Sequence, residues 1–144
     1  MTKFVISVDP GIEKSGLLLA DLEKNIVLDG KVVMKNMVLK RINFWRSNYR
    51  LDQVFIGNGT SSSYWIDSLK EIAPIKILEE RDSTLKARLR YWEIWPPNYL
   101  LRILPRNILL PPKDIDAVAA LVILENHLNR KLNWTGKPNF KIEL

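Results

Sequence analysis

Segments of strand character and segments of helix character follow one another along this chain in an order that few folds accommodate. Apolar and β-branched residues predict strands at 3–9, 15–21 and 26–34, with a hairpin turn at 21–25. Apolar residues spaced by four, three and four positions then predict one face of a helix within 35–50. The first third of the chain is therefore expected to form three strands and a helix.

Strands and helices alternate in the rest of the chain. The expected elements are a buried strand at 53–57, a helix through 65–72, a strand at 75–80, a helical piece at 83–92 and an apolar helix that ends near 128. We predict Asp114 as the N-cap of that last helix, and residues 130–144 as a tail or edge element. Strands that alternate with helices favour an α/β sheet with right-handed crossovers.

The size and composition of the chain are those of one globular domain over 1–144. It contains no cysteine, which excludes thiolate zinc sites, iron–sulfur clusters and thiol nucleophiles. No run approaches the roughly 20 apolar residues of a membrane span, and the N-terminus leads straight into a strand. We therefore expect a cytoplasmic protein with no membrane partner.

Positive charge is concentrated in one segment of the chain. The net charge is +6, and the stretch from Arg81 to Lys113 holds seven basic residues against two acidic ones. A cationic segment of this kind is typical of proteins that bind a polyanion. Within it, Arg88 and Arg90 stand among aromatic residues, as on surfaces that bind single-stranded nucleic acid. Inward packing of the aromatic rings explains the same pattern equally well.

Acidic residues stand at the ends of three expected elements. Asp9 ends the first strand, Glu79 and Glu80 end the fifth, and Asp114 and Asp116 open the last helix. Each has an ordinary explanation, as a turn residue, a solvated strand end or a helix cap. As a set, they offer the carboxylate oxygens that Mg²⁺ or Mn²⁺ prefers, and two such ions serve phosphodiester hydrolysis.

Five motifs occur in a fixed order along the chain. They are Asp9-Pro-Gly-Ile-Glu-Lys-Ser-Gly16, Gly57-Asn-Gly-Thr-Ser61, Glu79-Glu-Arg-Asp-Ser-Thr84, Ala87-Arg-Leu-Arg-Tyr-Trp92 and Pro111-Pro-Lys-Asp-Ile-Asp-Ala-Val-Ala-Ala120. From about Phe4 to Leu128 the chain thereby resembles the YqgF/RuvX family of Holliday junction resolvases. The resemblance implies a ribonuclease H-like α/β fold, with a five-stranded mixed sheet in the order 3-2-1-4-5 flanked by helices. It also implies a nuclease that acts on pre-16S ribosomal RNA at its 5′ end or on branched DNA.

Carried over by position, the resemblance assigns the catalytic and metal-binding acids to Asp9, Glu80 and Asp116, with two Mg²⁺ or Mn²⁺ ions as cofactors. Two positions depart from the pattern of related sequences. Ala117 follows Asp116 where a second Asp is frequent, and Glu79 stands where an Asp is usual. We therefore expect a site of three carboxylates, with Glu79 as the alternative to Glu80.

Expected contacts with nucleic acid come from two loops and from the cationic segment. Lys14, Asn58 and Thr60 are predicted to touch phosphates, and Arg88, Arg90, Arg102 and Arg106 to grip the nucleic-acid backbone. Two other functions stay open: a non-catalytic nucleic-acid-binding protein with the same fold, and a nucleotide-binding protein, which the shortness of the chain disfavours. The choice between RNA and DNA and the formation of a homodimer are open as well.

Overall fold

Five strands form one mixed sheet in this computed structural model, which describes residues 2–59, 62–80, 82–105, 109, 111, 114–136 and 141–143. The strands are β1 (Phe4–Asp9), β2 (Lys14–Asp21), β3 (Ile26–Met34), β4 (Leu51–Gly57) and β5 (Ile75–Leu78). Their order is β3-β2-β1-β4-β5, with β2 antiparallel to its neighbours and with β4 and β5 parallel to β1. The predicted mixed sheet of order 3-2-1-4-5 is confirmed, and the chain has a ribonuclease H-like fold.

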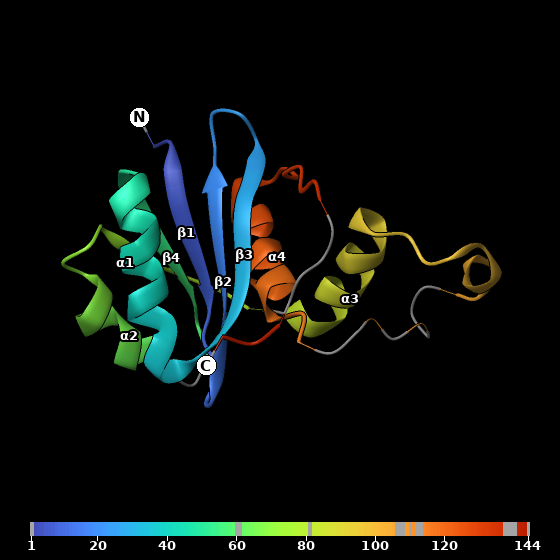
Figure 1. The fold of residues 1–144 in the computed structure, drawn as a ribbon, viewed down its shortest axis with the longest axis horizontal. Helices are drawn as coiled ribbons and strands as arrows, with labels where there is room; N and C mark the ends of the chain where they lie inside the picture. The colour runs from blue at the N-terminus through green and yellow to red at the C-terminus, as the bar shows by residue number, and fades with distance from the viewer. Residues whose placement is uncertain are drawn as a thin grey trace.

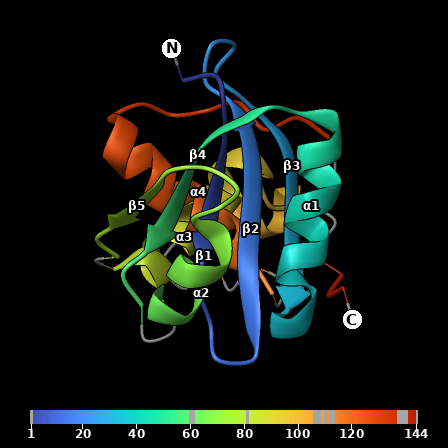
Figure 2. The same ribbon diagram turned by 90° about the vertical axis from the view of Figure 1, so that its left-hand side faces the viewer.

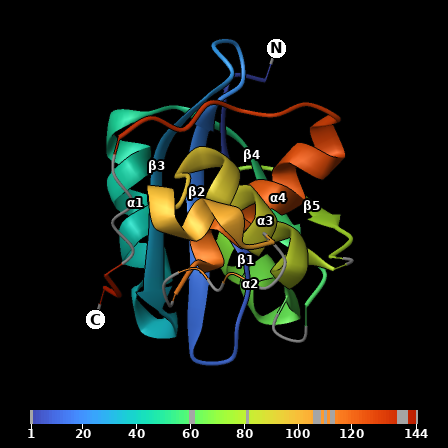
Figure 3. The same cartoon turned by 90° about the vertical axis from the view of Figure 1, so that its right-hand side faces the viewer.

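Helices cover both faces of this sheet (Figure 1). They are the short η1 (Lys35–Met37), α1 (Val38–Asn48), α2 (Ser62–Leu69), α3 (Ser83–Ile94), the short η2 (Tyr99–Ile103) and α4 (Asp116–Leu128). The α1 and α2 helices lie on one face (Figure 2), whereas α4 covers the other face and α3 packs on the outside of α4 (Figure 3). None of the described helices has the length and apolar character needed to cross a membrane.

The alternation of side chains along β1 divides the interior into two clusters. Ile6 and Val8 belong to the cluster beneath α1 and α2, whereas Val5 belongs to the cluster beneath α4. Ser7 is buried on the same side as Val5. Asp9 follows on the α4 side of the sheet, as the alternation predicts. Because helices cover both faces of the sheet, the sequences of its central strands are nearly continuous apolar runs.

Two strand boundaries differ from the sequence-based prediction. The β4 strand begins at Leu51, before the predicted start at 53, because Leu51 pairs with Phe4 of β1. The β5 strand ends at Leu78 rather than at 80, because its partner β4 ends at Gly57, opposite Leu78. Glu79 and Glu80 therefore follow the strand instead of belonging to it.

The predicted N-cap of the last helix is wrong. Ile115 takes the N-cap position of α4 and makes no side-chain hydrogen bond there. Asp114 has a left-handed backbone, with φ of 65°, and its carboxylate forms an ion pair with Lys14. The carboxylate of Asp114 is therefore used to fix a side chain of β2 rather than to cap α4.

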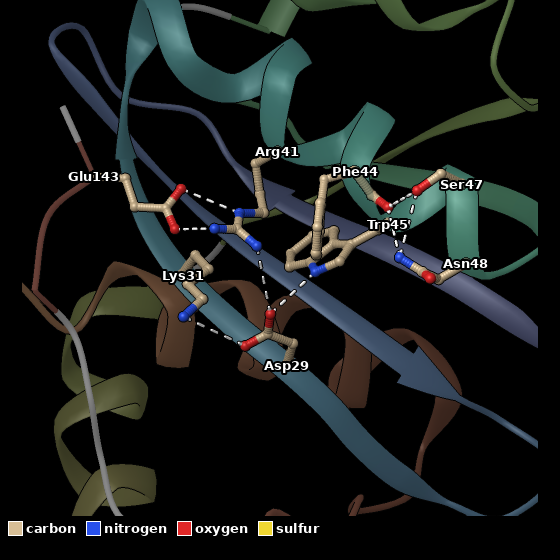
Figure 4. A network of polar contacts seen from close by, with 8 residues as sticks. All are labelled: Asp29, Lys31, Arg41, Phe44, Trp45, Ser47, Asn48 and Glu143. Carbon is tan, nitrogen blue, oxygen red and sulfur yellow. Dashed lines mark hydrogen bonds and ion pairs between the residues drawn. The ribbon is translucent and has the colours of Figure 1, made fainter.

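Two described residues near the C-terminus pair with β3, the edge strand of the sheet. Asn133 and Glu143 each form a parallel bridge to this strand. The Glu143 carboxylate also pairs with Arg41 of α1, and Asp29 of β3 accepts a hydrogen bond from the indole of Trp45 at 3.0 Å (Figure 4). These contacts join α1, β3 and the C-terminal segment.

A buried ion pair holds α3 on α4. The guanidinium of Arg90 donates to both carboxylate oxygens of Glu125, each at 2.9 Å, and also to the carbonyl of Leu132 at 2.9 Å. Glu125 is only 7% exposed. Burial of a carboxylate is tolerated when a cation and hydrogen bonds satisfy its oxygens. Arg90 is therefore a structural residue of the α3–α4 contact.

Replacement of this arginine is expected to destabilise the fold strongly. Arg90→Ala leaves the buried Glu125 without its partner, and the free energy of unfolding should fall by about 3–5 kcal/mol. The matched control is Arg88→Ala, because Arg88 lies half-exposed on the same helix and should change stability by less than about 0.5 kcal/mol. Urea denaturation followed by circular dichroism measures both, and equal midpoints would contradict the structural role of Arg90.

Candidate active site

Asp9 lies at the end of β1, beneath the first turn of α4. The hydroxyl of Ser7 donates a hydrogen bond to the carbonyl of Ala120 at 2.7 Å, which fixes the position of α4 over β1. Two residues along a strand cover about 6.6 Å, and four residues along a helix cover about 6 Å. Because Asp9 is two residues beyond Ser7 and Asp116 is four residues before Ala120, this register brings the two carboxylates to the same place.

A glycine allows the start of α4 to approach the sheet closely. Gly16 of β2 pairs with Asp9 across the antiparallel ladder. A Cβ atom at this position would lie only 1.9 Å from the carbonyl oxygen of Asp116. The first turn of α4 therefore rests directly on the backbone of β2, beside Asp9. Glycine within a strand commonly marks such a close approach of another backbone.

A second glycine makes room for Glu80. Gly57 ends β4 beside β1, and a Cβ atom there would lie 1.8 Å from Oε1 of Glu80. The Glu80 side chain therefore lies over Gly57 and reaches the carboxyl group of Asp9, whose pKa it raises. Glu79 instead lines a hollow with His127 and Asn126 of α4. Glu80 is thus the member of the pair that joins Asp9.

Burial raises the pKa values of all three acids. Burial raises the pKa of Asp9 to about 8, and the negative charges of Glu80 and Asp116 contribute to the shift. Burial likewise raises the pKa of Glu80 and of Asp116, although the nearby Lys14 ammonium opposes the shift at Asp116. At neutral pH and without a bound cation, the carboxyl group of Asp9 is therefore protonated. Groups perturbed in this way by burial and like charge are characteristic of functional sites.

The three carboxylates have the chemistry of a divalent-cation site. Oε1 of Glu80 and Oδ2 of Asp116 are buried, and neither has a hydrogen-bond partner in the described part of the chain. Oxygen atoms in this state fit the coordination shell of Mg²⁺ or Mn²⁺. Among the described residues, however, no three acidic or histidine side chains converge closely enough to hold one metal ion. Asp9 and Glu80 are in contact, while Asp116 faces Lys14.

Lys14 lies between two acids of the α4 end. Its ammonium forms an ion pair with Asp114 and stands 3.7 Å from Oδ2 of Asp116. The Asp114 hydrogen bond raises the pKa of this ammonium, which is therefore charged throughout the physiological range. Asn58, predicted to touch a phosphate, is exposed at the end of β4. Thr60, predicted for the same role, lies outside the described residues.

The cationic segment divides into structural and exposed residues. Arg90 is engaged by Glu125, whereas Arg88 is half-exposed and makes no hydrogen bond or ion pair with described residues. Arg102 is exposed, and its Nε donates to the carbonyl of Pro97 at 3.1 Å. Arg106 lies outside the described residues. Of the described arginines that were predicted to contact the nucleic-acid backbone, Arg88 and Arg102 are thus the two that face solvent.

The aromatic residues of α3 face the protein rather than solvent. Tyr91 is buried, and its ring contacts the rings of Trp92 and Trp95. The indole of Trp92 donates to the carbonyl of Leu109, and that of Trp95 to the carbonyl of Gly136. Tyr91 is therefore a core residue, and Trp92 and Trp95 pack against it partly buried, which agrees with the structural explanation of the cation–aromatic pattern.

Sequence reasoning gave no role in the site to Gly16 and Gly57, and it interpreted Asp114 as a helix cap rather than as the partner of Lys14. The glycines carried a usable signal, because each stands within or at the end of an apolar strand beside a predicted acid. No signal in the sequence indicated that Asp114 pairs with Lys14, because an acidic residue just before a helix is also typical of a helix cap.

Comparisons with known proteins give a distant structural likeness only. No family model matches the chain, and no curated protein matches it. Among solved structures, the chain is similar to T. thermophilus RuvC in complex with Holliday junction substrate, with 17% sequence identity and a TM-score of 0.47, over 90% of this chain and 99% of that chain. The ribonuclease H-like fold of this chain follows from the order and directions of its own five strands.

Removal of the Asp9 charge is expected to stabilise the protein when divalent cations are absent. The folded-state pKa of about 8 exceeds the ordinary value of 3.8, so the folded protein binds this proton more tightly than the unfolded chain. The resulting stability is full below pH 4 and is lost as pH rises to 8. Asp9→Asn should therefore gain about 1–3 kcal/mol at pH 8 and little at pH 4.

Thermal denaturation in EDTA at pH 4, 6 and 8 measures this gain. Asp67→Asn is the control, because Asp67 is an exposed carboxylate of α2 that pairs with Lys70. A melting temperature of Asp9→Asn that stays at the wild-type value at every pH would show that the three acids do not repel one another in the folded protein.

Proposed function

We propose that this chain is a metal-dependent nuclease, of the YqgF/RuvX type, that hydrolyses phosphodiester bonds of structured nucleic acid. The observation that carries the proposal is that Asp9, Glu80 and Asp116 lie half-buried at one end of the sheet, with two buried carboxylate oxygens that lack hydrogen-bond partners among the described residues. Such a cluster is costly for a fold unless a cation is to be held there. The net positive charge of the chain supports a polyanionic substrate.

Each of the three acids is positioned by a different element of the fold. Asp9 is fixed by the central strand, Glu80 lies over Gly57, and Asp116 is carried by the rigid first turn of α4. Divalent cations bound there supply charge neutralisation and Lewis acidity for hydrolysis of a phosphodiester. Until cations bind, Asp9 keeps its proton at neutral pH, and cation binding must release it.

The positive groups near the acids are suited to the substrate backbone. Lys14 is charged and held beside Asp116 by Asp114, so a phosphate that approaches the acids meets its ammonium. Arg88 and Arg102 present exposed or half-exposed guanidinium groups on the other side of α4. Pre-16S ribosomal RNA and four-way DNA junctions are the two substrates that we propose to compare.

The direct test is cleavage of these two substrates in Mn²⁺ by the wild type and by Asp9→Asn, Glu80→Gln and Asp116→Asn. Each substitution should lower the rate by at least about a hundredfold, which exceeds the ~10–100-fold effect of losing an outer partner of a metal ligand. Glu79→Gln is the matched control, because Glu79 carries the same charge next to Glu80 and lines a different hollow. Equal rates for wild type and Asp9→Asn would end the proposal.

Calorimetric titration with Mn²⁺ gives a readout that does not depend on turnover. The wild type should bind Mn²⁺ with release of protons, since the proton of Asp9 must leave. Proton release is obtained from the dependence of the heat on the buffer. Asp9→Asn should lose most of the affinity, and Glu79→Gln should retain it.

A second candidate function is nucleic-acid binding without catalysis. It is favoured by one observation: within the described part of the chain, no three ligand side chains converge, because Asp116 faces Lys14. This candidate requires binding that falls steeply with salt, has no need for divalent cations and is unchanged in Asp9→Asn. The cleavage and Mn²⁺ measurements separate the two candidates.

A further inference from the structure

Residues 96–104 form an arm with apolar side chains exposed to solvent. In Figure 1 the arm stands beyond α3, away from the sheet. Tyr99 is 83% exposed and Ile103 is 87% exposed, although both side chains are large and apolar. Leu100, Leu101 and Leu104 are exposed beside them. Contiguous apolar surface of this kind on a soluble protein commonly marks a binding site.

The arm is held in shape by its own contacts. The side chain of Asn98 caps η2 by accepting a hydrogen bond from the amide of Leu101 at 3.2 Å. Arg102 closes the segment by donating to the carbonyl of Pro97, a buried residue that follows another proline. Consecutive prolines restrict the backbone further. The apolar side chains are therefore presented by an ordered element, which lowers the entropy cost of binding.

The charge of the arm indicates the class of partner. From Ile94 to Lys113 the sequence contains basic residues and no acidic residue. Within η2, the exposed Arg102 lies in the sequence between Tyr99 and Ile103, the two most exposed apolar side chains. A surface that is apolar and purely cationic is complementary to a partner that is anionic and carries flat apolar groups. Nucleic-acid bases on a phosphate backbone combine these two properties.

We propose that the arm inserts its apolar side chains among unstacked bases of the nucleic acid, with Tyr99 and Ile103 as the principal contacts. This inference rests on the proposed function, because it takes nucleic acid as the substrate. Apolar side chains that enter a base stack must pay for unstacking, and that cost is smallest where bases are already unpaired. The arm therefore selects branch points, bulges or loops over continuous duplex.

The arm and the three acids can engage one nucleic acid. Asp116 is the twelfth residue after Leu104. A chain of this length spans at most about 40 Å, which is close to the ~34 Å of one duplex turn. The length of this connection therefore lets the arm and the acids contact the same nucleic acid. In this arrangement the arm determines which structural feature of the substrate is placed near the site of hydrolysis.

The test measures binding without cleavage, in EDTA, by full-length protein. The probes are a four-way DNA junction and an RNA stem-loop, each with 2-aminopurine at the branch or loop, and a continuous duplex of equal length. Binding of the wild type should unstack the 2-aminopurine base and thereby change its fluorescence. Tyr99→Ala combined with Ile103→Ala should abolish this change and weaken binding of the branched or looped probes by about tenfold or more. Duplex binding and the salt dependence should stay unchanged, because no phosphate contact is removed.

Phe44→Ala is the matched control, because Phe44 is a large apolar residue, 58% exposed, on α1 at the other face of the sheet. It should bind all three probes as the wild type does. Equal affinity of the arm variant and wild type for the branched or looped probes would overturn the inference. The inference would also be overturned if the arm variant lost the same affinity for the continuous duplex. It would likewise be overturned if the arm variant changed only the oligomeric mass of the protein in solution or only its binding to anionic lipid vesicles.

The two proposals fail in different measurements. If Asp9→Asn cleaves as well as wild type, the proposed catalytic site is wrong, and the binding of the arm variant is still decided in EDTA. If Asp9→Asn is inactive but the arm variant binds every probe normally, only the role of the arm is wrong. Absence of nucleic-acid binding by the wild type would overturn both.

Discussion

The close approach of α4 to the central strands is the contact on which the rest of the structure depends. Ser7 fixes the helix over β1 by bonding to Ala120, and the missing side chain of Gly16 lets the first turn of α4 rest on β2. This placement brings Asp116 to Asp9. It also provides the outer surface on which α3 packs, and α3 leads into the exposed arm. A small shift of α4 would therefore change the acid cluster and the cationic surface together.

The acid cluster opposes folding, and the two apolar clusters offset it. Three buried or half-buried carboxylates with raised pKa values destabilise the protein at neutral pH in the absence of a cation. Apolar side chains fill both faces of the sheet, including Trp45 and Trp65 beneath the helices of one face. Folds commonly retain such local destabilisation where it serves binding or catalysis, since the rest of the core tolerates it.

The cationic segment shows that one composition can serve two purposes. Arg90 and the aromatic rings of Tyr91 and Trp95 are turned inward and bind α3 to its neighbours. Arg102 and Tyr99, a short distance along the chain, are turned outward. The difference lies in the surroundings: α3 has the buried Glu125 and the body of α4 to pack against, whereas the arm extends beyond them. The composition of the segment alone, rich in basic and aromatic residues, would assign all of these residues to one surface that binds nucleic acid.

The periodicity of the sequence determined the elements, their order and the face of β1 that carries Asp9, because these depend on the local spacing of apolar residues. Tertiary structure alone decided which glutamate joins Asp9, since β5 ends at Leu78 and the alternation of strand faces does not extend to Glu80. It likewise decided that Lys14 pairs with Asp114, 100 residues away. Such pairings depend on how strands and helices approach each other in space, and the spacing of residues within one segment does not determine that approach.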